Sequence, residues 1–292
     1  MFKLRYGYLI SGIITGCILL VSFITTLPDG KLHLFFCDVG QGDAAYIKFP
    51  DGKDMLVDGG PDDKVILCLS RHMPFWDRDL ELVILTHPHL DHFMGLFSVF
   101  KNYKVISFAT ENLQNKSVGF NAFTDLVKSQ KTKSRFVLAG DRFILKDGVE
   151  FEIVGPKEEF LNVTSPQGFI GESGEFASVE TLIQYGKFSA LLTGDSQASE
   201  LEEILKQVQY DTPLSVLQVP HHGSHTGLTA EILNILNPKL AVISVGAKNK
   251  YGHPNPETLK ILGYKDIKIL RTDQDGEVEI ISDGKSFKIK SI

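Results

Sequence analysis

A dense group of potential metal ligands lies between residues 87 and 92. Three of the nine histidines fall here with one aspartate among them: His87, His89, Asp91 and His92. Imidazole and carboxylate groups are good ligands for zinc-like divalent ions. His87 and His89 are two residues apart, so in an extended loop both side chains point the same way. Asp91 and His92 can turn toward a neighbouring position. The spacing therefore predicts two adjacent metal sites rather than a surface loop with incidental histidines.

The histidine group directly follows an apolar run at 82–86 that is typical of a buried strand. A loop at the carboxyl end of a strand is a common place for a functional site, because the sheet is rigid and the loop is open. Along the rest of the chain, strand patterns alternate with helical patterns and no repeat of fixed period occurs. We therefore expect one α/β domain, with two mixed sheets packed together and helices outside.

Composition excludes several classes of protein. Of the 292 residues, 43% are hydrophobic and 23% are charged, which excludes a disordered chain. The net charge of −6 provides no general basic surface, so a nucleic-acid substrate would need a local patch or a metal. Three cysteines without a CxxC pair exclude a cysteine-based zinc finger and cannot build a disulfide framework. GxSxG and GxxxxGK[ST] motifs are absent, which argues against a serine esterase and a P-loop enzyme.

The amino-terminal segment is apolar. No charged residue stands between Arg5 and Asp29. Residues 6–27 therefore form an apolar stretch close to the roughly 20 residues that span a bilayer core. Lys3 and Arg5 precede this stretch, and the positive-inside rule then places the amino terminus in the cytoplasm and the rest of the chain outside.

We expect residues 1–28 to be a single membrane anchor and residues 29–292 to be an extracytoplasmic domain in the cell membrane. A cleaved secretory signal is an alternative, although the stretch is long and residues 23–27 have no small-x-small cleavage site. A lipoprotein signal ending at Cys17 is another, because residues 14–17 read ITGC. Both alternatives also export the domain, secreted or lipid-anchored. A buried core helix is disfavoured because the stretch has no polar face.

Six short motifs resemble those of one protein family, the metallo-β-lactamase superfamily, and in particular the β-lactamase-like domain of ComEC-type DNA-uptake proteins. They occur in family order: DVGQGD at 38–43, VDGG at 57–60, THPHLDH at 86–92, LLTGD at 191–195, VPHHGS at 219–224, and SVG at 244–246 followed by YGHP at 251–254. The resemblance implies a four-layer αββα sandwich with hydrolase activity. ComEC proteins have many membrane spans and this chain has one candidate, so we interpret it as a stand-alone relative.

The resemblance also implies how the ligands are divided. His87 and His89 would bind one ion, and the other ion would lie at Asp91 and His92. Asp195 would bridge the two ions, because dications roughly 3.5–4 Å apart need a shared carboxylate. An aspartate after a glycine is also a common turn residue, which is the alternative interpretation of Asp195.

Further roles follow from the same resemblance. We favour His221 over His222 as the ligand that completes the site of Asp91 and His92, because adjacent loop residues point in different directions. His222, as a catalytic group, and Ser224 would then face the substrate. His253 would donate to a phosphate or protonate a leaving group, unless it is an ordinary surface histidine.

Two aspartates outside the ligand set complete the predicted site. Asp43, which we group with the catalytic residues His222 and His253, and Asp58 would hydrogen bond the metal ligands. Asp58 has the alternative role of a turn residue before two glycines. The wider superfamily has a further histidine between the first group and the Asp195 motif, and none is present here. A carboxylate from 172–180 or a water would fill that place, so we expect one or two divalent ions, zinc or manganese.

A divalent ion lowers the pKa of its water toward about 7 and so supplies hydroxide at neutral pH. Our first hypothesis is a phosphodiesterase or DNA nuclease of ComEC type with a phosphodiester or nucleic-acid substrate. Lys248, Lys250 and Lys260 would form a cationic rim near His253, or simply a solvated face. The second hypothesis is hydrolysis of another ester, a lactone, a β-lactam or a cell-envelope phosphoester. The third is a non-catalytic extracellular binding module. The membrane would be a partner through the amino-terminal helix, and the sequence identifies no protein partner.

Overall fold

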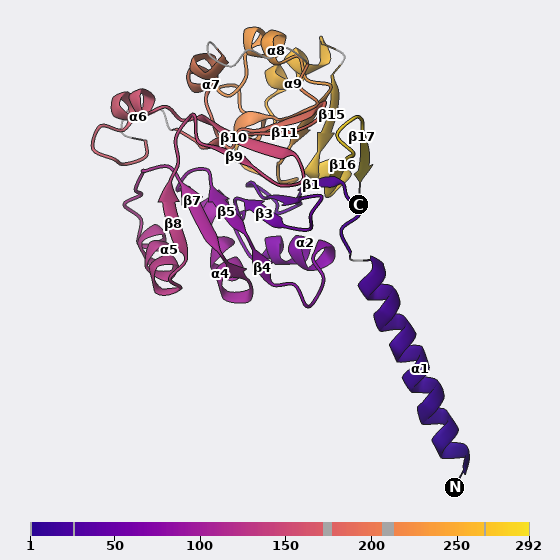
Figure 1. Ribbon diagram of the computed structural model, residues 1–292. Coiled ribbons are helices and arrows are strands. Elements are labelled where there is room, and N and C mark those ends of the chain that lie inside the picture. Colours follow the sequence, from indigo (N-terminus) through magenta and orange to yellow (C-terminus); the bar gives the residue numbers. More distant parts are fainter. Residues whose placement is uncertain (1, 26, 172–176, 206–212, 266, 292) are drawn as a thin grey trace.

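Two β-sheets lie face to face, and helices cover both outer faces (Figure 1). The computed structural model describes residues 2–25, 27–171, 177–205, 213–265 and 267–291. Buried apolar side chains form one large cluster between the sheets and one between each sheet and its helices. The described part of the chain therefore has helix, sheet, sheet and helix layers, and the predicted α/β fold is confirmed.

The first sheet has the strand order β17-β16-β1-β2-β3-β5-β7-β8. Neighbouring strands are antiparallel from β17 to β3 and parallel from β3 to β8. The strands are β1 (Leu32–Phe36), β2 (Ala45–Lys48), β3 (Asp54–Val57), β5 (Leu82–Leu85), β7 (Ser107–Thr110), β8 (Lys133–Phe136), β16 (Val278–Ser282) and β17 (Phe287–Ser291). β3 and β5 are almost wholly apolar because both of their faces are covered.

The second sheet has the strand order β15-β14-β13-β12-β11-β10-β9. Its strands are parallel from β15 to β12 and antiparallel from β12 to β9. They are β9 (Arg142–Ile144), β10 (Val149–Gly155), β11 (Glu180–Tyr185), β12 (Phe188–Leu192), β13 (Val216–Gln218), β14 (Leu240–Ile243) and β15 (Lys268–Arg271). A small separate sheet pairs β4 (Asp79–Leu80) with β6 (Lys104–Val105).

In the described part of the chain, helices cover the outer face of each sheet. α2 (Lys64–His72), α4 (Leu96–Asn102) and α5 (Val118–Ser129) pack on the first sheet, and α7 (Ala198–Leu205), α8 (Ala230–Leu236) and α9 (Pro256–Gly263) pack on the second. Shorter elements are α3 (Leu90–Phe93), α6 (Glu158–Thr164), η1 (Pro220–Gly223) and α10 (Thr272–Asp275). Local sequence explains where several of them begin: Thr229 Oγ1 caps α8, and Asn255 caps α9 ahead of a proline in its first turn.

The parallel strands of the two sheets end at one edge of the sandwich. The loops after β3 and β5 carry Asp58 and residues 86–92, and the loop after β12 carries Asp195. Residues 219–224 follow β13 in the same way, and Ser244 follows β14. Because the carboxyl ends of neighbouring parallel strands meet, residues far apart in the chain become neighbours here. This edge is where the predicted site residues gather.

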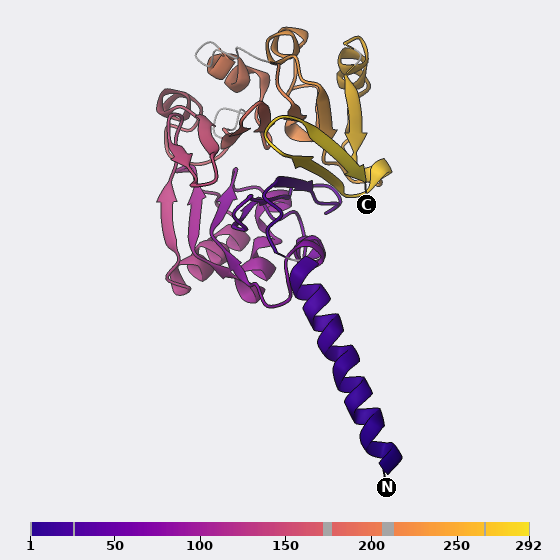
Figure 2. The same ribbon diagram turned by 45° about the vertical axis from the view of Figure 1, so that its right-hand side comes forward.

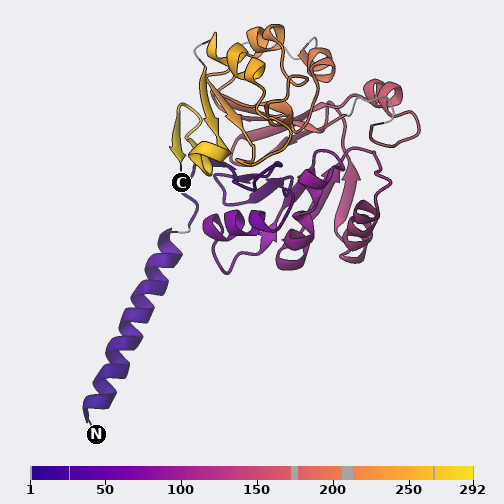
Figure 3. The same ribbon diagram turned by 180° about the vertical axis from the view of Figure 1, so that it is seen from behind.

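α1 (Phe2–Thr25) extends away from the two sheets (Figure 2). Seen from behind, it leaves the body on the side where β17 ends (Figure 3). The apolar amino-terminal segment is therefore a helix. Within the described residues, however, no helix has both the length and the apolar character needed to cross a membrane. The predicted transmembrane anchor is not supported by the structure.

A disulfide bridge joins Cys37 to Cys68. Cys37 follows β1 and Cys68 lies in α2, and both are buried. Cys17, in α1, is free and exposed. Three cysteines without a CxxC pair predicted no disulfide framework, and this single bridge forms because the fold brings together two cysteines that are 31 residues apart. The bridge ties α2 to the end of the strand that leads into the 38–43 loop.

Candidate metal centre

His92 is buried and held on one side by Asp58. Its Nδ1 lies 2.7 Å from Asp58 Oδ2. Asp58 also accepts hydrogen bonds from the backbone N and from Oγ1 of Thr86, at 2.8 and 2.7 Å. A histidine that donates one ring N–H to a carboxylate presents the lone pair of its other nitrogen, which is the form that binds metals. His92 Nε2 is buried and has no hydrogen-bond partner among the described residues, so it is available for an ion.

Four residues converge on one point, which we call site A: Asp91, His92, Asp195 and His222. One ligand atom of each lies within 4.8 Å of the others. His222 Nε2 is 3.5 Å from Asp91 Oδ2 and 3.5 Å from Asp195 Oδ1. In the described structure neither His222 Nε2 nor Asp195 Oδ1 has a hydrogen-bond partner. Buried polar atoms without partners are costly, and their convergence on one point is what a cation site requires.

A second group, site B, contains His87, His89 and Asp195. His87 Nε2 is 2.9 Å from His89 Nδ1 and 3.6 Å from Asp195 Oδ2. His221 Nε2 is also 3.6 Å from Asp195 Oδ2. The two imidazoles that are two residues apart therefore point the same way, as the spacing predicted. Site B holds nitrogen ligands around one carboxylate oxygen.

Asp195 faces both sites. Its Oδ1 is 3.4 Å from His92 Nε2 in site A, and its Oδ2 is 3.6 Å from His87 Nε2 in site B. Its backbone N donates to Ser178 Oγ at 3.2 Å, and the preceding Gly194 has φ +50° with no room for a side chain against Thr86 and Ser178. The turn that holds Asp195 is thus fixed by close packing. This is the geometry of a bridging carboxylate.

The electrostatics of the two sites differ. Burial alone would lower the pKa of His92, but Asp195 and Asp58 outweigh it and hold that pKa well above its usual value. Burial alone would raise the pKa of Asp195, but the imidazoles of His222, His92 and His87 keep it well below the usual range. In site B burial lowers the pKa of His87, so its imidazole is neutral. A cation entering site A therefore displaces protons, whereas site B presents neutral nitrogens.

The structure corrects the choice between the two adjacent histidines. We expected His221 to complete the site of Asp91 and His92, but it is His222 that lies there, and His221 lies beside site B. Both residues have positive φ, 51° and 55°, which turns the backbone sharply between them. His222 is buried and its Nδ1 lies 3.0 Å from the carbonyl oxygen of Ser244, which aims Nε2 into site A. His222 is therefore placed as a ligand, not as a group facing the substrate.

Asp43 lies behind His222. Its Oδ1 is 3.5 Å from His222 Nδ1, on the ring edge opposite to site A, and its side chain is buried. The 38–43 loop approaches the histidine loop so closely that a Cβ on Gly42 would lie 2.2 Å from the carbonyl oxygen of Asp91. Asp43 is thus in position to orient a ligand and not to touch a substrate, which corrects its predicted grouping with the catalytic residues.

His253 and Ser224 differ in their relation to the sites. The His253 ring centroid is 5.6 Å from that of His221, and His253 is half-buried at the rim. Ser224 is buried, and its Oγ lies 3.1 Å from Thr226 Oγ1 rather than toward either site. The structure therefore brings His253 to the centre but does not bring the Ser224 hydroxyl there.

We expected a carboxylate from residues 172–180 or a water to complete the site of His87 and His89, and Glu180 does not supply it. That residue is buried, with a pKa raised to about 8 by burial, and it belongs to neither site. Residues 172–176 of the same loop lie outside the described residues. Beside site B the structure places His221, which we expected at the site of Asp91 and His92.

Comparison with known proteins identifies the fold. The family model described as "Metallo-beta-lactamase superfamily" matches residues 37–247. The chain belongs to this superfamily. Its fold binds divalent metals, and the buried unpartnered atoms of His92, His222 and Asp195 fit such an ion. Metallo-β-lactamase proteins are typically hydrolases, in agreement with the predicted class.

Two curated relatives are similar over most of the chain. ComE operon protein 3 of Bacillus subtilis is 26% identical over 296 residues, which cover 93% of this chain and 36% of that protein. Recombination protein 2 of Haemophilus influenzae is 26% identical over 92% of this chain and 31% of that protein. The chain thus spans about a third of the length of these relatives. Their names are consistent with a metallo-β-lactamase relative of the ComEC competence type, as the motifs predicted.

Solved structures agree on the fold. Igni18, a metallo hydrolase from Ignicoccus hospitalis, superimposes with a TM-score of 0.54 at 14% identity, covering 85% of this chain and 98% of that chain. At this identity the likeness shows the superfamily fold alone.

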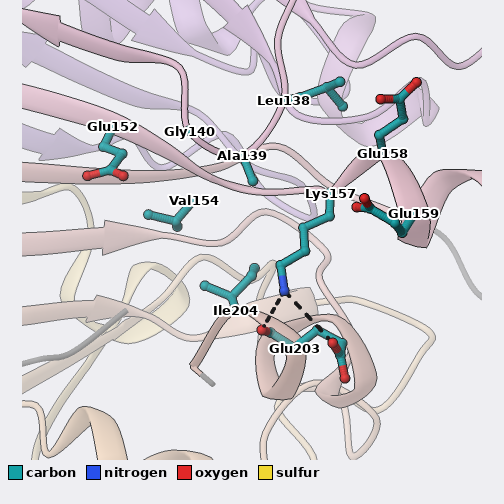
Figure 4. A pocket seen from close by; sticks show the side chains of 10 residues that line it. All are labelled: Leu138, Ala139, Gly140, Glu152, Val154, Lys157, Glu158, Glu159, Glu203 and Ile204. Carbon is teal, nitrogen blue, oxygen red and sulfur yellow. Dashed lines mark hydrogen bonds and ion pairs between the residues drawn. The ribbon is translucent and has the colours of Figure 1, made fainter. Parts of the chain in front are cut away.

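A large cavity of about 690 Å³ lies away from sites A and B, beside α6 and α7 (Figure 4). None of its lining residues belongs to site A or site B. Its one lysine, Lys157, donates from Nζ to the carbonyl oxygen of Glu203 at 2.9 Å and pairs with the same residue's carboxylate. The chemistry is therefore assigned to the strand-end loops and not to this cavity.

Three residues that position the ligands of sites A and B were not predicted from the sequence. Thr86 fixes Asp58, Ser178 accepts from the Asp195 backbone, and the Ser244 carbonyl fixes the ring of His222. Thr86 and Ser244 both lie in motifs that had been recognised, so their position was a usable signal. Ser178 lies in no motif, and its role follows from the hydrogen bond that joins the segment just before β11 to the loop after β12.

Proposed function

We propose that the chain is a metal-dependent phosphodiesterase of the ComEC type that acts on nucleic acid. The observation that carries the proposal is the orientation of Asp195, whose Oδ1 faces site A and whose Oδ2 faces site B. Two adjacent cation sites that share a carboxylate suit phosphoryl transfer, because they stabilise both the attacking and the leaving oxygen. The curated relatives carry names from competence and recombination, which favours a nucleic-acid substrate.

Site A would hold one ion through Asp91, His92, Asp195 and His222, and site B another through His87, His89 and Asp195, with His221 beside it. Zinc or manganese is suited to these nitrogen and oxygen ligands. A divalent ion held by these residues would supply hydroxide at neutral pH by lowering the pKa of water.

The protein groups around the two sites would position ligands and substrate. Asp58 and Asp43 hold the rings of His92 and His222 from behind. His253, whose ring centroid lies 5.6 Å from that of His221, would donate a hydrogen bond to a phosphate bound at the two sites or protonate the leaving oxygen.

The disulfide bears on where the domain works. Disulfides persist in oxidising compartments and are rare in the cytosol. The buried bridge between Cys37 and Cys68 therefore favours a domain that acts outside the cytoplasm. We retain export of the domain as part of the proposal, and nuclease activity outside the cytoplasm would act on incoming or extracellular nucleic acid.

The test is hydrolysis by the purified chain after addition of Mn²⁺ or Zn²⁺. Substrates are bis-p-nitrophenyl phosphate, labelled single- and double-stranded DNA, and nitrocefin, with Asp195→Ala as the inactive control. We expect metal-dependent cleavage of the phosphodiester and of DNA, and none by the variant. Hydrolysis of nitrocefin alone would replace the phosphodiesterase with a β-lactamase. Absence of bound metal and of every activity would leave a non-catalytic binding module.

A further inference from the structure

The loop between β14 and α9 reaches the rim of the metal centre and is held rigid by one side chain. Asn249 Nδ2 donates to the carbonyl oxygens of Gly246 (2.8 Å) and His253 (2.7 Å). Its Oδ1 accepts from the backbone N of Tyr251 (3.2 Å) and of His253 (3.1 Å). The 246–255 loop is further tied to the 38–43 loop, because Gly246 N donates to Gln41 Oε1 at 3.1 Å. The residues that it presents are therefore fixed relative to the metal centre.

Aromatic rings lead from the metal centre out to solvent along this loop. The His253 ring lies 5.6 Å from the ring of His221 and 6.3 Å from that of His222. The Tyr251 ring stacks on His253 at a centroid distance of 5.9 Å and an interplanar angle of 29°. Tyr251 is 61% exposed and belongs to none of the apolar core clusters of the described chain. Its ring contributes little to the core, and only the His253 ring separates it from His221 and His222 at the metal centre.

The same loop is cationic in an acidic domain. From residue 29 onward the chain has 28 basic against 36 acidic residues, a net charge of −8. Residues 246–255 carry Lys248 and Lys250, both exposed, and no acidic residue. Lys250 Nζ lies 5.8 Å from the centroid of the Tyr251 ring. An exposed aromatic ring flanked by cations is the pattern with which proteins hold single-stranded nucleic acid.

We propose that Tyr251 is a stacking platform for an unpaired nucleobase next to the phosphate that is cleaved, with Lys248 and Lys250 contacting the neighbouring phosphates. The inference rests on the proposed function and specifies its substrate. A phosphate on sites A and B places the adjacent nucleotide at the rim, where the exposed face of Tyr251 is available. A base inside a duplex is already stacked and paired, so this subsite selects a single strand or an unpaired end.

The test measures binding and cleavage separately. Binding of a fluorescent oligothymidylate, and of an abasic oligomer of the same length, is measured at low salt with the full chain loaded with Ca²⁺ in place of Mn²⁺, so that the phosphate can bind at sites A and B. Stacking on an aromatic side chain contributes about 1–3 kcal/mol per base, so we expect Tyr251→Ala to weaken oligothymidylate binding by roughly 5- to 160-fold. Binding of the abasic oligomer should change by less than about 2-fold, and Tyr251→Phe should bind like the wild type. With Mn²⁺, kcat/KM for the two oligomers should follow the same pattern.

Tyr264 provides the matched control. It is 77% exposed, and Lys260 Nζ lies 5.7 Å from its ring centroid, so the pair resembles Tyr251 and Lys250. Tyr264 follows the end of α9 that lies far from the metal centre. Tyr264→Ala should therefore leave oligothymidylate binding and DNA cleavage unchanged.

Each outcome is decisive. Unchanged oligothymidylate binding in Tyr251→Ala, an equal loss with the abasic oligomer, an equal loss in Tyr264→Ala, or no binding by the wild type overturns the inference. If the wild type binds through Tyr251 but cleaves no phosphodiester, the proposed function fails while the stacking subsite stands. If the wild type cleaves DNA and Tyr251→Ala changes neither binding nor cleavage, only the stacking subsite fails.

Discussion

Asp58 Oδ2 lies 2.7 Å from His92 Nδ1, on the edge of the ring opposite to the nitrogen that faces site A. The carboxylate fixes both the tautomer and the orientation of this ligand, so it supports metal binding without touching the ion. Asp58 has φ 61°, a conformation that asparagine also tolerates. Replacing Asp58 by asparagine therefore removes the charge with little change in the backbone.

We expect Asp58→Asn to weaken metal affinity by about 10- to 100-fold, because the amide is a poorer acceptor and does not enforce the tautomer. Titration of Zn²⁺ into chelator-treated protein measures the effect, and circular dichroism checks the fold. Affinity equal to that of the wild type would show that His92 needs no support from Asp58.

The assignment of the adjacent histidines to different sites is testable by double-mutant cycles. His222 and Asp91 share site A, so the losses in Mn²⁺ affinity caused by His222→Ala and Asp91→Ala should be strongly non-additive. His221 lies beside site B, and His221→Ala combined with Asp91→Ala should come closer to additivity. Calorimetric titration of each single and double variant gives the coupling. Stronger coupling of Asp91 to His221 than to His222 would reverse the assignment.

The pH dependence of stability should carry the signature of Asp54. Asp54 is the first residue of β3, and its buried side chain accepts a hydrogen bond from the hydroxyl of Tyr46. Burial raises the pKa of Asp54 to about 7, although the hydrogen bond from Tyr46 opposes the shift. An aspartate in the unfolded chain titrates near pH 4. Between these values the folded protein binds one more proton than the unfolded chain, so stability falls as pH rises from about 4 to 7 and then levels off.

Asp54→Asn removes that titration and keeps an acceptor for Tyr46. Urea denaturation in the presence of a chelator, at pH 5 and pH 8, should show a fall in the free energy of unfolding that is on the order of 2 kcal/mol larger in the wild type than in the variant. Parallel pH profiles of the two proteins would contradict the burial of an ionisable Asp54.

The disulfide should contribute measurably to stability. Cys37 and Cys68 are 31 residues apart, and closing a loop of that size in the unfolded chain is worth about 3.7 kcal/mol. We expect the Cys37→Ser, Cys68→Ser double variant to lose this amount in urea denaturation, and the wild type to lose it on reduction. Cys17→Ser is the control, since Cys17 is free and exposed. Equal stability of oxidised and reduced wild type would contradict the bridge.

Much of the fold and of the site could be predicted because metal-binding residue types occur in short motifs directly after predicted strands. The strand at 82–86 ends directly at His87, so sequence order alone places the histidine group at a sheet edge. Asp195 follows a strand in the same way. Where parallel strands end together, such residues meet without any knowledge of the loops between them.

Other features could not be predicted because they depend on backbone turns and on pairing across the fold. The choice between His221 and His222 is decided by two consecutive positive φ angles, which no pattern of residue types specifies. The pairing of Cys37 with Cys68 depends on how α2 packs beside β1. Ser224 lies in a recognised motif, yet its hydroxyl turns to Thr226.

The central claim is that loops from distant parts of the chain converge on divalent cations through Asp195. Metal content after chelation and reloading with Mn²⁺ or Zn²⁺ tests it most directly, in the wild type and in Asp195→Asn. We predict that the wild type takes up one or two ions per chain, and that the variant, which loses the carboxylate common to both sites, binds them at least 100-fold more weakly. A wild type that acquires no ion, or a variant that binds ions as tightly as the wild type, would contradict the account.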